Sequence, residues 1–216
     1  SMLVKRAELM HFVVDGGERL DALTKAFRDA FQTSPKVVVS APGRAEIIGN
    51  HTDHNRGSVV AAALNVETLA LAAPATGSRS TLYSLGWDHV FSVDTKSSPT
   101  VDDSDSQRLM RGVARGLYER GYAAPSFNAV IDSRVAPGSG MSSSAAFEMT
   151  IVGIHEALSE EEVQPIDAAL IGKFAENEYI GKPSGAMDQI ASSIGGCIAI
   201  DFSDPENPRY HQLDLS

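Results

Sequence analysis

The chain has 216 residues, of which 18 are Lys or Arg and 28 are Asp or Glu, and its formal net charge is −10 with histidine neutral. This length favours one domain or two small ones, and a hydrophobic share of 43% excludes disorder as the main state. The acidic surplus disfavours nucleic acid and anionic membranes as partners, because both attract positively charged surfaces.

Cys197 is the only cysteine, which excludes a disulfide framework and a cysteine-based zinc cluster. We expect it to pack as a small hydrophobic residue in a protein of the reducing cytosol. No run approaches the roughly 20 apolar residues of a transmembrane helix, and the N-terminus lacks the apolar core of a signal peptide. The expected location is therefore cytoplasmic, and Ser1 and Met2 are interpreted as a remnant of cloning.

The first half of the chain predicts one helix followed by several strands. Apolar residues recur at helical spacing between Glu18 and Phe31, which predicts an amphipathic helix. The β-branched run from Lys36 to Ser40 predicts a strand that ends in a turn at Pro42 and Gly43. Three apolar runs separated by glycine and polar residues then predict neighbouring strands at 58–75, 80–85 and 89–93.

The second half predicts a mixture of helices and strands. Polar residues 102–105 offer an N-cap for a helix through Leu109 and Leu117, which Gly121 ends. Further helices are expected at 142–158 and 166–179, and strands at 127–131 and 197–200. Because the strands and helices do not alternate regularly, the pattern favours an α+β fold over a doubly wound parallel sheet.

The first segment with possible chemistry is Pro137–Ala146, where a Gly-Ser-Gly loop and three serines precede a predicted helix. Exposed backbone N–H groups and the positive end of a helix dipole favour an anion there, and a serine can add a Mg²⁺ ligand beside a polyphosphate. The alternative is an ordinary loop with a serine N-cap. The segment matches neither a Walker loop nor a nucleophile elbow.

The second segment is the polar run Gly43–Asn55, directly after a predicted strand. Its side chains combine hydrogen-bond donors and acceptors, as recognition of a hydroxyl-rich ligand such as a sugar requires. One alternative is a zinc site at His51, Asp53 and His54, for which no further ligand is evident. Another is a polar turn capped by Asp and Asn.

The third segment is Glu176–Gln189, in which a helix is expected to end near Gly181 before a Pro-Ser-Gly turn. The turn is followed by Asp188, which lies between the apolar residues Met187 and Ile190. A carboxylate in this setting is either a helix N-cap or a positioned base.

In this order, the three segments resemble those of the galactokinase branch of the GHMP small-molecule kinases, and the similarity runs from about Val37 to the end. The resemblance implies an ATP- and Mg²⁺-dependent sugar 1-kinase that phosphorylates the anomeric hydroxyl of galactose. It also implies that residues 1–216 form the sugar- and ATP-binding N-terminal domain, with a ribosomal protein S5 domain 2-like α+β fold. In this family a ferredoxin-like domain follows, which we expect this chain to lack, so we expect the chain to be inactive alone.

The resemblance also assigns roles to residues. Asp188 would be the catalytic base with Arg44 beside it, and Ser144 and Glu176 would hold Mg²⁺. The sugar would be bound by Asn50, His51, Asp53 and Gly185, and the ATP phosphates by Gly138, Ser139, Gly140, Met141, Ser142, Ser143 and Ser144.

One position departs from the family's pattern, because Asn50 stands where the sugar motif usually has Glu. The change removes a charge and adds an NH₂ donor, so a kinase for another sugar, an N-acetylhexosamine or a uronic acid, is one alternative. A non-catalytic sugar sensor related to galactokinase is the other. Such a sensor is expected to alter the serine loop or the base, and both are present here.

Overall fold

The computed structural model describes residues 16–49, 57–85, 89–138 and 143–213. Its helices and strands follow one another along the chain as α2 (Gly16–Phe31), β1 (Val37–Ile48), β2 (Ser58–Pro74), β3 (Arg79–Ser84), β4 (His89–Asp94), α3 (Asp105–Glu119), β5 (Phe127–Ser133), α4 (Ser143–Ser159), α5 (Pro165–Ala175), the π-helix η2 (Glu176–Ile180), α6 (Met187–Ile194), β6 (Cys197–Asp201) and β7 (Arg209–Gln212).

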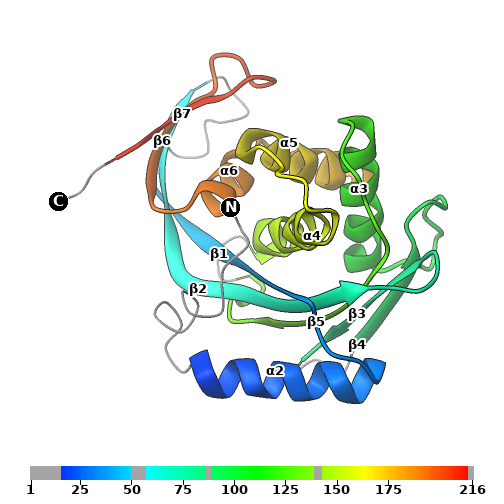
Figure 1. The fold of residues 1–216 in the computed structure, drawn as a ribbon. Helices are drawn as coiled ribbons and strands as arrows, with labels where there is room; N and C mark the ends of the chain where they lie inside the picture. The colour runs from blue at the N-terminus through cyan, green and yellow to red at the C-terminus, as the bar shows by residue number, and fades with distance from the viewer. Residues whose placement is uncertain (1–15, 50–56, 86–88, 139–142, 214–216) are drawn as a thin grey trace.

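The strands form one mixed sheet in the order β4-β3-β5-β2-β6-β7, and β1 pairs with β2. All described pairs are antiparallel except β3 with β5. β2 is long enough to pair with β6 along its first part and with β5 along its last part. Helix α2 covers one face of this sheet, and α3, α4, α5 and α6 lie on the other (Figure 1). The α+β prediction is thereby confirmed.

The last part of β2, residues 68–73, is buried from both sides, and its side chains are divided between the two faces by the period of two that a strand imposes. Leu69, Leu71 and Ala73 pack with Leu23 and Phe27 of α2. The intervening alanines of β2 face the helical layer instead and belong to the main core. Cys197 is buried, as expected for a small hydrophobic residue. Within the described residues, no helix is long and apolar enough to cross a membrane.

The helix predicted between Glu18 and Phe31 is confirmed as α2, and the helix predicted to end at Gly121 is confirmed as α3. Gly121 has a φ of +84°, and a capping box at Ser104 and Gln107 begins the second of these helices within the predicted polar segment. The predicted turn at Pro42 and Gly43 is wrong, because β1 continues to Ile48 and accommodates the proline through a register shift. β2 and β3 are not neighbours either, since β5 lies between them.

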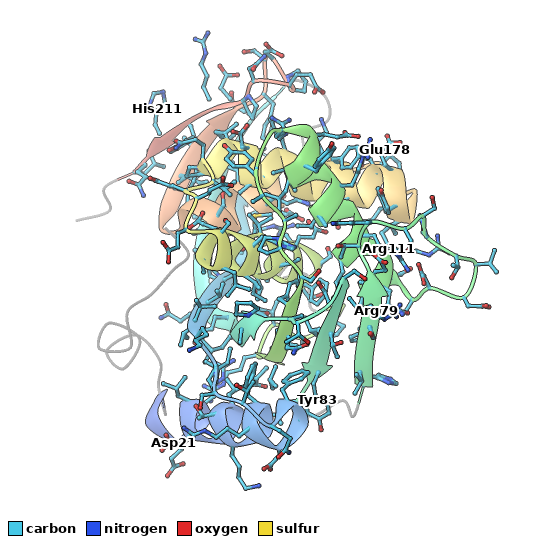
Figure 2. All side chains as sticks on the ribbon, turned by 45° about the vertical axis from the view of Figure 1, so that its right-hand side comes forward. Asp21, Arg79, Tyr83, Arg111, Glu178 and His211 are labelled. Atoms are coloured by element: carbon cyan, nitrogen blue, oxygen red, sulfur yellow. The ribbon has the colours of Figure 1, made fainter. Side chains whose placement is uncertain are left out.

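Arg19 fixes α2 to the sheet with a buried guanidinium group. Its Nη1 donates to Oε1 of Glu67 at 3.0 Å, and its Nε donates to Oδ2 of Asp132 at 2.6 Å. The backbone oxygen of Asp132 accepts a third hydrogen bond from Nη2 at 2.9 Å. Asp21, on the same helix, points away from the sheet into solvent (Figure 2). The position of α2 therefore depends on one ionic cluster in addition to its apolar face.

Replacing Arg19 with methionine should lower the free energy of unfolding by about 3 kcal/mol, because it leaves two partly buried carboxylates without their cation. Urea unfolding followed by circular dichroism measures this change. Lys25→Met is the matched control on the same helix, since the Lys25–Asp29 pair is exposed and should contribute little. Equal losses in both variants would show that Arg19 is no more important than a surface charge.

His155 of α4 is buried, and its ring meets that of Phe127 edge to face at 5.3 Å between centroids. Burial lowers the pKa of His155 from 6.5 to about 4. Between these values the unfolded chain binds a proton that the folded chain does not. His155 therefore lowers stability as the pH falls from 6.5 towards 4, by about 3 kcal/mol in all. Above pH 6.5 the residue contributes no pH dependence.

The His155→Leu variant is accordingly expected to show a smaller loss of unfolding free energy between pH 6.5 and pH 4 than the unmodified protein. Urea unfolding at several pH values gives the two slopes. The same slope in both proteins would mean that other groups cause the acid sensitivity.

Candidate active site

Arg44 and Asp188 form an ion pair between β1 and α6, 144 positions apart in sequence. The Nε of Arg44 donates to Oδ1 of Asp188 at 2.5 Å. The side chain of Arg44 is 8% exposed, whereas that of Asp188 is 32% exposed. The guanidinium group thus lies behind the carboxylate, and the carboxylate is the member that a ligand can reach. Such a carboxylate can accept a hydrogen bond from a ligand hydroxyl.

Asp188 is the second residue of α6, and Ala186 is the N-cap of that helix. The interpretation of Asp188 as a helix N-cap is therefore wrong. Gly185 precedes the cap and is half-buried. A second contact joins α6 to β1, because Ser192 donates a hydrogen bond to the backbone oxygen of Pro42 at 2.6 Å. The base predicted from sequence is consequently held by its own helix and by the strand that carries Arg44.

Glu176 and Ser144, which the family resemblance pairs as ligands of one ion, also lie together. The hydroxyl of Ser144 donates to Oε1 of Glu176 at 2.7 Å, and the hydroxyl of Ser184 donates to Oε2 at 2.7 Å. The Nζ of Lys182 lies 3.6 Å from Oε1. Ser144 is in the first turn of α4. A hydroxyl and a carboxylate are therefore brought together at the N-terminal end of α4, where the helix dipole favours an anion.

The chain around Glu176 differs from the sequence prediction. A continuous helix was expected to Tyr179, but α5 ends at Ala175 and the π-helix η2 begins at Glu176. The wider turns of a π-helix change the direction of the side chains that follow, and such segments are frequent at functional sites. Gly112 of α3 approaches here so closely that a Cβ would lie 2.8 Å from the Cβ of Ala175. The glycine allows α3 to support this turn.

Two further polar residues belong to the site, and neither was predicted as a functional residue. Glu148 of α4 and Gln189 of α6 are almost completely buried, and Nε2 of Gln189 donates to Oε2 of Glu148 at 3.0 Å. Burial, followed by the charge of Glu176, raises the pKa of Glu148 well above its usual value. The available signal was one acidic residue within the apolar run from Ala145 to Ile154.

A cavity of about 390 Å³ opens beside the serines of α4. This volume is within the range of small-molecule sites. Its walls come from β2, β3, β4, β5, α3 and α4, and they combine apolar side chains with several hydroxyl groups, His89 and Asp105. The lining includes Leu82, Phe91, Leu109, Phe147, Ser143 and Ser144. An aromatic ring could be bound there with a charged group near the two serines.

Several predicted residues lie outside the described part of the chain. These are Asn50, His51 and Asp53 of the sugar segment, together with Ser139, Gly140, Met141 and Ser142 of the loop. The zinc alternative, which also needs His54, falls outside it as well. Gly138 is described and has a φ of +72°, which suits glycine. Across the described ranges, no group of three or more His, Cys, Asp or Glu side chains could hold a metal ion.

Two family models match the chain. The galactokinase galactose-binding signature matches residues 25–74, and the N-terminal domain of GHMP kinases matches residues 108–196. Among curated relatives, a galactokinase of Clostridium perfringens strain 13 is 36% identical over 181 residues, and the match covers 82% of this chain and 46% of the relative. A galactokinase of Staphylococcus carnosus is 31% identical over 197 residues, covering 90% of this chain and 51% of the relative. The chain thus spans about half the length of these relatives.

The solved structures agree with these matches. Lactococcus lactis galactokinase in complex with galactose superposes with a TM-score of 0.80 at 28% identity, covering 92% of this chain and 53% of that one. Mevalonate kinase of Methanococcus jannaschii shares the fold with a TM-score of 0.66 at 14% identity, over 85% of this chain and 57% of that one. The two family models, the curated relatives and the shared fold lead to one assignment: the chain belongs to the GHMP kinases, in the galactokinase branch.

Proposed function

We propose that the protein is an ATP-dependent sugar 1-kinase that transfers the γ-phosphoryl group of ATP to the anomeric hydroxyl of galactose. The observation that carries this proposal is the reachable carboxylate of Asp188 held against the buried Arg44, with Glu176 and Ser144 close by. Gln189 is adjacent to Asp188 in α6, and its Nε2 lies 3.4 Å from Oε2 of Glu176. This contact supports treating the two pairs of residues as parts of one site.

In this proposal Asp188 is the base of the transfer. The carboxylate accepts the proton of the anomeric hydroxyl while the oxygen of that hydroxyl forms a bond to the γ-phosphorus, and the bond from that phosphorus to the bridging oxygen of ADP breaks. The guanidinium of Arg44 stabilises the negative charge that develops on the sugar oxygen. Its hydrogen bond to Asp188 also fixes the direction of the carboxylate.

Ser144 and Glu176 suit a Mg²⁺ ion that accompanies ATP. Both offer oxygen, the ligand atom that Mg²⁺ prefers, and the two groups are already within 2.7 Å of each other. Mg²⁺ commonly takes one or two protein oxygens and completes its coordination with water and phosphate oxygens, so two residues are sufficient. When bound, the ion neutralises charge on the phosphates.

ATP is proposed to lie along the N-terminal end of α4. Backbone N–H groups of the segment 138–144 would hold the phosphates, as the helix dipole favours there. The 390 Å³ cavity beside Ser143 and Ser144 has the size and apolar lining for the purine ring.

Galactose is the proposed sugar because the matched signature is galactose-binding and the Lactococcus lactis relative was solved with galactose. Asn50, His51, Asp53 and Gly185 are the residues proposed to contact it. Asn50 favours a second candidate for the sugar substrate of the same reaction, an N-acetylhexosamine or a uronic acid. The reason is that the amide of Asn50 offers a hydrogen-bond donor where the family usually has a carboxylate.

We further propose that residues 1–216 are the N-terminal sugar- and ATP-binding domain of such an enzyme, and that a ferredoxin-like domain completes the cleft. The support is the match to the GHMP N-terminal domain and the roughly half coverage of full-length relatives.

A sugar panel tests the substrate. ATP turnover by the enzyme that carries this chain would be measured with galactose, glucose, N-acetylgalactosamine and galacturonate. The expected result is the highest kcat/KM for galactose. Turnover with the N-acetylated sugar or the uronic acid but not with galactose would transfer the assignment to the second candidate, and turnover with none would refute the kinase proposal.

A further inference from the structure

Gln189 occupies an unusual position for an uncharged polar side chain, because it lies between two carboxyl groups in the interior. It is 1% exposed, and the helices α4, α5 and α6 around it are in mutual contact (Figure 1). Its Nε2 lies 3.0 Å from Oε2 of Glu148 and 3.4 Å from Oε2 of Glu176. One amide group can offer one hydrogen to each carboxyl group.

The contacts of Glu176 show what this arrangement does. Ser144 donates to Oε1, while Ser184 and Gln189 approach Oε2. Ser144 lies in the first turn of α4 and Ser184 precedes α6, and both are half-buried, whereas Gln189 in α6 is 1% exposed. Gln189 is therefore the most deeply buried of these three donors. Removal of the amide would take this hydrogen bond from Oε2 and weaken the restraint on rotation of the carboxylate.

Glu148 completes the arrangement by orienting the amide. A carboxyl group without exposure is costly in an apolar helix, so a residue such as leucine would serve packing better. The neighbouring helix nevertheless leaves space for it, because a Cβ on Gly172 would lie 2.7 Å from Oε2 of Glu148 and 2.8 Å from Cγ of Gln189. The close fit of Gly172, Glu148 and Gln189 indicates that the direction of the Gln189 amide is built into the core.

We propose that Gln189 is a positioning residue, which with Glu148 behind it holds the carboxylate of Glu176 in the orientation that binds the magnesium–nucleotide complex. The inference rests on the proposed function for the role of Glu176. Gln189 follows Asp188 directly in α6, so the same helical turn fixes the base and the carboxylate. A displacement of this turn would alter both at once.

The test compares the binding of Mg·ADP by the unmodified protein and by Gln189→Met, measured by isothermal titration calorimetry over a range of Mg²⁺ concentrations. Methionine keeps the length of the side chain and removes the amide. Loss of a group that orients a metal ligand typically weakens affinity about 10- to 100-fold, and we expect a change in this range. In turnover assays, KM for Mg·ATP should rise more than kcat falls.

Thr150→Val is the matched control. Thr150 is a buried polar residue of α4 whose hydroxyl donates to the backbone oxygen of Ala146 within the same helix. The Thr150→Val variant should have a changed unfolding temperature and an unchanged affinity for Mg·ADP. If both variants weaken binding equally, the effect of Gln189→Met is one of general packing and the inference is wrong.

Glu148 provides a second test that does not depend on the folding of Gln189→Met. Glu148→Gln retains an oxygen that accepts from Nε2 of Gln189 and should bind Mg·ADP nearly as well as the unmodified protein. Glu148→Leu removes that acceptor and should bind more weakly. Equal affinities in these two variants would overturn the role given to Glu148 and Gln189.

These outcomes separate the inference from the proposed function. A protein that binds Mg·ADP, loses affinity in Gln189→Met and phosphorylates no sugar refutes the kinase proposal but supports the positioning role. A working kinase whose Gln189→Met variant binds Mg·ADP normally refutes the positioning role alone. Absence of Mg·ADP binding in the unmodified protein overturns both.

Discussion

The Asp188→Asn variant of the enzyme that carries this chain is expected to lose between about 10²- and 10⁴-fold in kcat, the usual contribution of a positioned base. The amide of asparagine keeps the shape of the side chain and can still accept a hydrogen bond from Arg44, but it cannot take the proton of the sugar hydroxyl. Because the sugar and ATP contacts are otherwise unchanged, KM should change much less than kcat. Steady-state kinetics with both substrates varied measures this difference.

Asp167→Asn is a closely matched control for this change. Asp167 lies in the first turn of α5 and pairs with Arg120 at 2.9 Å, and its side chain is 31% exposed against 32% for Asp188. It therefore reproduces the helix position, the arginine partner and the exposure without lying at the proposed site. A kcat for Asp188→Asn that equals that of Asp167→Asn would remove Asp188 from the mechanism.

The second large effect is expected for Glu176→Gln, which should lower kcat/KM for Mg·ATP by about 10²-fold or more. Glutamine has the same shape but lacks the charge that attracts a divalent cation, and its NH₂ group would oppose the hydroxyl of Ser144 or that of Ser184. Raising the Mg²⁺ concentration should recover part of the lost activity, which a loss of folding would not allow.

Glu156→Gln controls for the removal of a buried carboxylate. Glu156 lies on the same helix as Ser144, is 7% exposed against 4% for Glu176, and accepts a hydrogen bond from the backbone of Val163. We expect this variant to lose stability and to keep the Mg²⁺ dependence of the unmodified enzyme. If Glu176→Gln also keeps the Mg²⁺ dependence of the unmodified enzyme, the proposed role of Glu176 is wrong.

Much of the fold could be predicted from local patterns. The structure differs from these predictions where long-range contacts determine the ends of an element or the order of the strands. The helix at Gly16–Phe31 and the capped helix after Ser104 carry strong periodicity and end signals. Pro42 followed by Gly43 is typical of a turn, but pairing with β2 extends the strand β1 across both residues. The eight residues of α6 have no side-chain cap, so the chain after the Pro-Ser-Gly turn carried no helix signal. The insertion of β5 between β2 and β3 is a property of the whole sheet.

The candidate site was predictable as far as its residues belong to sequence motifs. Arg44 with Asp188 and Ser144 with Glu176 were paired on the family resemblance, and the structure brings each pair into contact. Glu148 and Gln189 belong to no such pattern. Their partners come from three helices, so their function becomes visible only when the helices are packed together.

Asp188 is proposed to direct phosphoryl transfer to the anomeric oxygen of galactose. The most direct test incubates the enzyme with Mg·ATP and galactose labelled with ¹³C at C1, and records the ³¹P and ¹³C NMR spectra of the product. We expect coupling between the new phosphorus and the labelled C1, and loss of this product in Asp188→Asn. Phosphate on another carbon, or an unchanged rate in Asp188→Asn, would contradict it.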